Sequence, residues 1–228
     1  MPGVGGGEVL IAAVSDGAGT AKRSEAGSSL AVARFLQDFG AAVAADPSLT
    51  SIDRLFADEW LDSVRNEIAQ LAAEEGNQRQ DYACTLLGAV VGRSGAVYVQ
   101  IGDGAIVVAG EEVGEYNWIF WPQHGEYANS TNFLTQEQTA ETLLFETGPS
   151  VDEIAIFSDG IERLVLDLST KTVHSPSFRP IFKWLAGTEP NDDRQPSPAL
   201  IAYLGSDHVN RRTDDDKTLV MATRAVAD

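Results

Sequence analysis

The stretch from Tyr82 to Ala109 decides the fold, and it reads YACTLLGAVVGRSGAVYVQIGDGAIVVA. Three runs in it are rich in β-branched and other apolar residues and are typical of strands: 82–91, 96–101 and 105–109. Glycine-containing links of four and three residues separate them. Because links this short cannot hold a crossover helix, they predict that consecutive strands are antiparallel neighbours.

Two long helices are expected before this stretch. Ser24–Ala45 and Ser51–Glu75 each place apolar side chains at helical spacing, Phe35 and Phe39 in the first and Trp60 in the second. They predict a helical hairpin with a broad apolar face. A short apolar run, 9–14, precedes the hairpin and is typical of a buried strand that enters a glycine-rich loop.

The rest of the chain alternates short strands with short helices. Strands are expected near residues 116–121, 142–146, 153–158 and 218–223, helices near 160–165, 180–185 and 198–204, and a surface loop over 187–198. No internal repeat or linker divides the sequence, so we expect a single domain over residues 1–228. Many antiparallel strands with paired helices predict a layered α+β sandwich.

Composition limits the classes of partner. Thirty-four acidic against sixteen basic residues give a net charge of -18, which would repel nucleic acid and attract divalent cations. The alternative is that the acidic residues only keep the protein soluble. No apolar run approaches the roughly 20 residues that span a bilayer, so no membrane association is expected. A single cysteine, Cys84, excludes an internal disulfide and favours a cytoplasmic protein with a buried, inert thiol.

Three acidic clusters lie where predicted strands end: Asp16-Gly17, Asp159-Gly160 and 214–216. Strand ends at one edge of a sandwich converge, and carboxylates beside an open glycine carbonyl are the oxygen donors that Mg²⁺ and Mn²⁺ prefer. Asp-Gly is also a common turn dipeptide, so any one of these clusters could be structural. Asp103-Gly104 could simply close a hairpin.

The order of these motifs resembles the protein phosphatase 2C family. The motifs are Val14-Ser-Asp-Gly-Ala-Gly, Thr85-Leu-Leu-Gly-Ala-Val-Val, Gln100-Ile-Gly-Asp-Gly, Ile156-Phe-Ser-Asp-Gly-Ile and Asp215-Asp-Lys-Thr-Leu-Val. Gly125-Glu-Tyr-Ala-Asn-Ser-Thr is similar to a segment of a bacterial branch of that family. The resemblance runs from about Val9 to Thr223.

The resemblance implies a four-layer sandwich of two antiparallel sheets flanked by helix pairs. It implies a metal-dependent hydrolase that removes phosphate from phosphoserine and phosphothreonine in proteins, with a metal-activated water as nucleophile. Two Mg²⁺ or Mn²⁺ ions are implied: Asp16 would bridge them, the Gly17 carbonyl would bind the first, and Asp159 and Asp215 would hold the second. Asp103 resembles the aspartate that helps to hold a weak third ion.

The implied partners are a phosphorylated protein substrate and, in signalling, a partner kinase or its target. The alternative is a non-catalytic, phosphatase-like regulatory or binding module. Asp216 adjoins Asp215 and could take its place as ligand. Ala18 stands where relatives often carry a histidine that serves as general acid, and His124 is a candidate substitute. Arg163 stands where many relatives have an aspartate that serves the third metal.

The segment before Asp16 also departs from the family pattern. Relatives carry an acidic motif and a phosphate-binding arginine on a strand ahead of this aspartate. Only fifteen residues precede Asp16 here, and the first arginine is Arg23. We therefore expect that strand to be missing. Its loss and Ala18 favour the non-catalytic alternative, whereas the retained Asp16, Asp159 and Asp215 favour the enzyme, which we expect.

Overall fold

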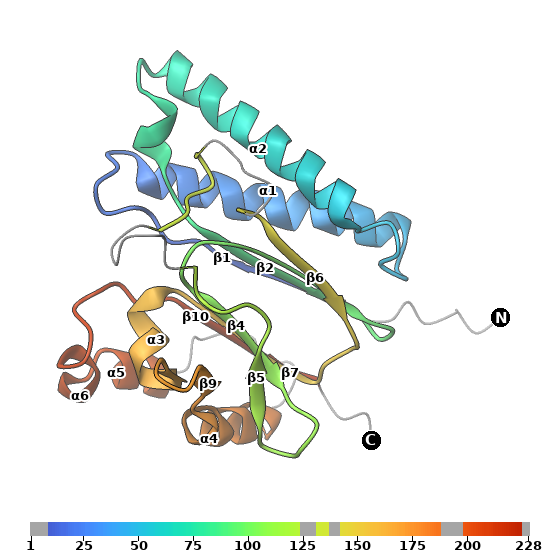
Figure 1. Cartoon of the computed structure of the whole chain (residues 1–228), viewed down its shortest axis with the longest axis vertical. Coiled ribbons are helices and arrows are strands. Elements are labelled where there is room, and N and C mark those ends of the chain that lie inside the picture. Colours follow the sequence, from blue (N-terminus) through green and yellow to red (C-terminus); the bar gives the residue numbers. More distant parts are fainter. Residues whose placement is uncertain (1–8, 124–130, 137–141, 188–197, 225–228) are drawn as a thin grey trace. The chain divides into compact units, whose positions relative to one another are not determined.

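The computed structural model describes residues 9–123, 131–136, 142–187 and 198–224 (Figure 1). The chain forms two compact units. The first consists of residues 1–103 and 122–151, and the second of residues 104–121 and 152–228. The expectation of one domain over residues 1–228 stays a prediction.

The first unit contains a four-stranded antiparallel sheet in the order β1-β2-β3-β6. Its strands are β1 (Leu10–Val14), β2 (Leu86–Val91), β3 (Ala96–Ile101) and β6 (Leu144–Gly148). Every residue of β2 and β3 is buried, which explains why their sequences are apolar without alternation.

Two long helices cover this sheet. The helix α1 (Ser24–Ala45) packs on β1 and β2, and α2 (Arg54–Glu74) packs on α1, as Figure 1 shows. Their contact is aromatic: Phe35 stacks on Phe39, and both meet Trp60 edge to face. Asp53 begins α2 by accepting a hydrogen bond from the Phe56 N–H at 2.9 Å.

The second unit contains another four-stranded antiparallel sheet, in the order β10-β7-β4-β5. Its strands are β4 (Ala105–Ala109), β5 (Tyr116–Trp118), β7 (Glu153–Phe157) and β10 (Leu219–Thr223). A separate two-stranded hairpin pairs β8 (Leu166–Asp167) with β9 (Thr172–Val173).

The helices of this unit follow β7 in sequence. They are α3 (Asp159–Val165), α4 (Ser175–Ala186), α5 (Pro198–Leu204) and α6 (Asp207–Asn210). The phenylalanines of α4, Phe178 and Phe182, pack on Tyr116 of β5, and Phe178 also meets Phe157 of β7. This aromatic group forms the centre of the second core.

The structure confirms the α+β class and most of the predicted elements. It corrects the interpretation of 102–104 as a hairpin link, because β3 and β4 belong to different sheets. Each of these strands already pairs on both edges, β3 with β2 and β6, and β4 with β7 and β5, so neither has an edge left for the other.

Several predicted boundaries are also wrong. The run from Tyr82 does not start as a strand, because Gln78 and Asp81 cap a 3₁₀ turn, η1 (Arg79–Tyr82), and β2 begins only at Leu86. The strand expected over 116–121 ends at Trp118. The helix α4 starts before Pro180, which lies inside it. Most of the loop expected over 187–198 lies outside the described residues.

Candidate functional site

Asp16 lies two residues beyond the end of β1, and Thr85 fixes its backbone. The Asp16 N–H donates to Thr85 Oγ1 at 2.9 Å, and the Asp16 carbonyl accepts the Thr85 N–H at 2.8 Å. Ser15 adds a third bond from its hydroxyl to the Thr85 carbonyl at 2.6 Å. The position of the Asp16 backbone therefore depends on Thr85, the residue that precedes β2.

Gly17 is required by the helix that follows it. A β-carbon at this position would lie 2.7 Å from the β-carbon of Ser24, the first residue of α1. The neighbouring Ala18 N–H donates to the Ala83 carbonyl at 2.9 Å, which holds the loop against the segment between η1 and β2. Among the residues described, none donates a hydrogen bond to the Gly17 carbonyl, so this oxygen can serve a cation.

Asp103 belongs to the same end of the first sheet. Gly102 adopts a φ of +118°, and a β-carbon there would lie 2.5 Å from Thr85 Cγ2. Thr85 thus touches both the Asp16 loop and the residue before Asp103. The Asp103 carboxylate accepts a hydrogen bond from the hydroxyl of Thr131.

In the second unit, Asp159 is the first residue of α3 and lies two residues beyond the end of β7. Ser158 ties this point to the start of β10: its N–H donates to the Thr218 carbonyl at 3.1 Å, and its hydroxyl accepts the Thr218 N–H at 3.1 Å. Asp159 therefore lies close to the end of β7, next to the beginning of the neighbouring strand β10.

Asp215 and Asp216 lie on the loop that reaches this point. A β-carbon on Gly160 would come within 2.0 Å of the Asp216 carbonyl oxygen, so the loop crosses directly over the Asp159-Gly160 peptide. Asp215 Oδ1 accepts the Asp216 N–H at 2.9 Å, and the Lys217 ammonium donates to the Asp215 carbonyl at 3.1 Å.

Each unit thus brings two of its predicted aspartate loops to one sheet edge: Asp16 with Asp103, and Asp159 with Asp215. In the described ranges, no group of three or more His, Cys, Asp or Glu side chains is gathered closely enough to hold a metal ion. The donors nevertheless fit a hard cation in kind, because all of them are carboxylate or carbonyl oxygens and Gly17 is open. The residues that hold these loops together, Thr85 and Ser158, sit inside the sequence motifs but were not singled out from the sequence.

The residues that depart from the family pattern have ordinary structural surroundings. Ala18 is 7% exposed. The Arg23 guanidinium donates to the Glu75 carboxylate, which raises the pKa of Arg23 and lowers that of Glu75. Arg163 is exposed on α3. His124 lies outside the described residues, as does the segment 125–130.

The predicted role of Cys84 as a buried thiol is confirmed. The side chain has no exposed surface, and burial raises its pKa to about 11. A thiol that is neutral and inaccessible is a poor nucleophile. The chemistry of the site therefore does not use it.

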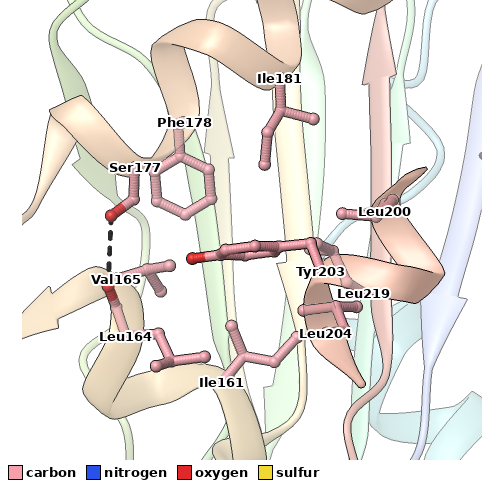
Figure 2. A pocket seen from close by; sticks show the side chains of 10 residues that line it. All are labelled: Ile161, Leu164, Val165, Ser177, Phe178, Ile181, Leu200, Tyr203, Leu204 and Leu219. Atoms are coloured by element: carbon pink, nitrogen blue, oxygen red, sulfur yellow. Dashed lines mark hydrogen bonds between the residues drawn. The ribbon is translucent and has the colours of Figure 1, made fainter. Parts of the chain in front are cut away.

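An apolar cavity lies elsewhere in the second unit, between α3, α4, α5 and β10. Figure 2 shows the side chains of Ile161, Phe178 and Tyr203 around it, with the Ser177 hydroxyl turned to the Leu164 carbonyl at 3.2 Å. No carboxylate, histidine or basic side chain lines it. The cavity is part of the packing of this unit and not of the aspartate edge.

Comparisons with known proteins agree with one another. The family described as protein phosphatase 2C matches residues 3–202. Serine/threonine-protein phosphatase 3 of Escherichia coli K12 is 34% identical over 217 residues, which cover 94% of this chain and 83% of that protein.

Two solved structures share the fold at low identity. PppA, described as a key regulatory component of the T6SS in Pseudomonas aeruginosa, matches with a TM-score of 0.58 at 19% identity, over 98% of this chain and 92% of the other. The S. agalactiae serine/threonine phosphatase matches with a TM-score of 0.58 at 16% identity, over 96% and 87%.

Proposed function

This chain belongs to the protein phosphatase 2C family and is a protein serine/threonine phosphatase, and we propose that it works with two divalent cations held by Asp16, Gly17, Asp159 and Asp215. The proposed ions are Mg²⁺ or Mn²⁺, because the donors are oxygens and the chain carries a net charge of -18.

The observation that carries this proposal is the pairing of loops within the second unit. Gly160 leaves no space between the Asp159 turn and the Asp215–Asp216 loop, and Ser158 bonds to Thr218 on both its N–H and its hydroxyl. An ordinary turn does not need a second acidic loop pressed onto it. The contact brings two loops that carry carboxylates to one strand end, which supports a metal-binding role.

In the first unit, the residues proposed as cation ligands are Asp16 and Gly17. Thr85 fixes the backbone of Asp16, so its carboxylate projects from a defined position, and none of the described residues donates a hydrogen bond to the Gly17 carbonyl. Pre-set donors lose little freedom on binding, which favours tight ligation. When bound, the cations would activate a water for attack on the phosphorus and would offset the negative charge of the phosphoryl group.

The chain's own residues would then place the substrate and exclude competing nucleophiles. Neither Cys84, which is buried, nor a serine elbow is needed, because water is the attacking group. The products are a serine or threonine hydroxyl on the protein and inorganic phosphate. Because a kinase must supply such a substrate, we propose a role opposite a protein kinase in cytoplasmic signalling. In the parts of the chain that the structure describes, no helix could cross a membrane.

The test is a phosphatase assay on a phosphothreonine peptide under a Mn²⁺ titration. Asp159→Asn keeps the shape and removes the charge, so we expect turnover to fall by about 100-fold or more with little change in melting temperature. Asp62→Asn, an exposed position on α2, is the matched control and should turn over at the parent rate.

Calorimetry with Mn²⁺ tests the ligands separately from the chemistry. Asp16→Ala should lose most of the saturable binding because this carboxylate would serve both ions. If Asp159→Asn retained the parent rate, or if Asp16→Ala bound Mn²⁺ as the parent does, the assignment of the site would be wrong.

A further inference from the structure

The segment 131–136 is attached to the rest of the first unit through both backbone polar groups of Leu134. The Leu134 carbonyl accepts the Arg65 Nε–H at 2.8 Å, and the Leu134 N–H donates to the Cys84 carbonyl at 2.8 Å. The Leu134 side chain is fully buried in the core formed with α2 and β2. Because Cys84 also lies opposite Gly17 in an isolated bridge, the segment sits one residue pair away from the Asp16 loop.

The burial of Arg65 beside the segment 131–136 costs free energy. Its side chain comes from α2 and is 8% exposed, and a buried guanidinium is costly unless its donors are satisfied. The Arg65 Nε–H donates a hydrogen bond to the Leu134 carbonyl in this segment at 2.8 Å. The burial of this charged side chain therefore indicates that Arg65 serves to hold the segment 131–136 in place.

The segment is also braced internally. Gln136 accepts the Phe133 N–H on Oε1 at 3.2 Å and donates from Nε2 to the Thr131 carbonyl at 3.4 Å. Thr131 is therefore positioned by a compact turn and not by a free loop. Its hydroxyl donates to Asp103 Oδ2.

Asp103 is held in place through the backbone of the preceding residue, Gly102. The Gly102 N–H donates to the Gln123 side chain at 2.9 Å, and the Gly102 carbonyl accepts from the Gln123 N–H at 3.2 Å and from the Gln100 side chain at 3.2 Å. The Asp103 carboxylate thus projects from a hydrogen-bonded turn toward Thr131, which is also held by hydrogen bonds. A charge-assisted hydrogen bond between two such groups is among the stronger ones in proteins.

We infer that Thr131 and Asp103 form a latch that fixes the segment 131–136 at the end of β3, and that the Asp103 carboxylate serves this latch instead of ligating a third cation. The latch gives Asp103 a role that needs only its acceptor oxygen.

Amide hydrogen exchange in EDTA tests the latch without any metal and without activity. Thr131→Val removes the hydroxyl and keeps the shape, and we expect exchange at Asn132 and Phe133 to speed up about tenfold or more. Leu134 should stay protected because Arg65 and Cys84 still hold it. Thr131→Ser retains the donor and should keep protection within about threefold of the parent.

The second arm distinguishes a latch from a metal ligand at Asp103. Asp103→Asn keeps an acceptor for Thr131, so we expect protection at Asn132 and Phe133 to remain close to that of the parent, and the number of Mn²⁺ ions bound per chain to stay the same. Unchanged exchange in Thr131→Val, or the loss of one bound Mn²⁺ in Asp103→Asn, would overturn the inference.

Discussion

Gly160 lies directly under the carbonyl of Asp216: a β-carbon there would be 2.0 Å from that oxygen and 3.0 Å from its carbon. Real β-carbons do not come this close to a backbone atom, so the glycine is what allows the loop before β10 to cross the turn after β7. The Asp-Gly dipeptide, which sequence alone cannot distinguish from a turn, is here a contact between two proposed metal loops.

Gly160→Ala should therefore push the Asp215–Asp216 loop away from Asp159. We expect a loss of about 1–3 kcal/mol in unfolding free energy, as for other overpacked sites. Mn²⁺ affinity should fall about tenfold or more, measured by calorimetry. Gly187→Ala is the control in the same unit, because a β-carbon there meets only ordinary contacts of 3.6 Å and beyond. A Gly160→Ala variant with parent affinity would show that the two loops need not touch to bind metal.

Cations should stabilise the folded chain. Only the folded state gathers the aspartates, so a ligand at about 100 times its dissociation constant adds about 2.7 kcal/mol of stability. For a chain of this size that corresponds to about 5–10 °C in Tm. Melting curves with Mn²⁺, and again after excess EDTA, give the measurement. Identical curves under both conditions would contradict a site formed by folding.

Two tyrosines of the first unit should respond in opposite ways to replacement by phenylalanine. The Tyr98 hydroxyl is buried without a hydrogen-bond partner among the described residues, whereas the Tyr82 hydroxyl donates to Glu75 at 2.7 Å. Tyr98→Phe should leave the unfolding free energy unchanged or raise it by about 1 kcal/mol, and Tyr82→Phe should lower it by about 1 kcal/mol. Urea unfolding at pH 7 measures both, and a reversed order would contradict the assignment.

The same substitution predicts a pH effect. Burial raises the pKa of Tyr98 from 10.0 to about 12, so the folded state favours the neutral phenol. Its contribution is fully present below pH 10 and is lost as the pH rises through about 12. Unfolding free energy should therefore fall less steeply between pH 10 and 12 in Tyr98→Phe than in the parent.

The sequence predicted the elements whose signal is local. The bounds of α1 and of β3 and β4 agree with the expected ranges because each is a long periodic or uninterrupted apolar run between glycines or polar turns. The link 102–104 was misinterpreted because its length permits a hairpin, and only the pairing of β3 and β4 with other strands, including β7 about fifty residues away, excludes one.

The site could be predicted only in part for the same reason. The aspartates are visible in the sequence as motifs, but their supports are long-range contacts. Thr85 bonds to Asp16 from 69 residues away, and Thr131 reaches Asp103 across 28 residues. No local pattern marks Arg65 as the anchor of Leu134, because an arginine on an amphipathic helix is ordinarily exposed.

The last prediction concerns the leaving group. Ala18 carries no proton donor, is 7% exposed, and has both its N–H and its carbonyl in backbone hydrogen bonds, so the loop offers no acid at this position. Arg23, the first arginine of the chain, forms an exposed ion pair with Glu75. General acid catalysis is worth about 100-fold or more to a poor leaving group and little to a good one.

We therefore expect this chain to hydrolyse an activated aryl phosphate more efficiently than a phosphothreonine peptide at saturating Mn²⁺, by about 100-fold in kcat. The rate on the peptide should show no fall above pH 7 of the kind that a titrating histidine acid would produce, because Ala18 offers no such group to the leaving oxygen. His124→Asn is the decisive variant, since His124 is the candidate substitute. Efficient peptide turnover that this variant abolishes would show that His124 supplies the proton.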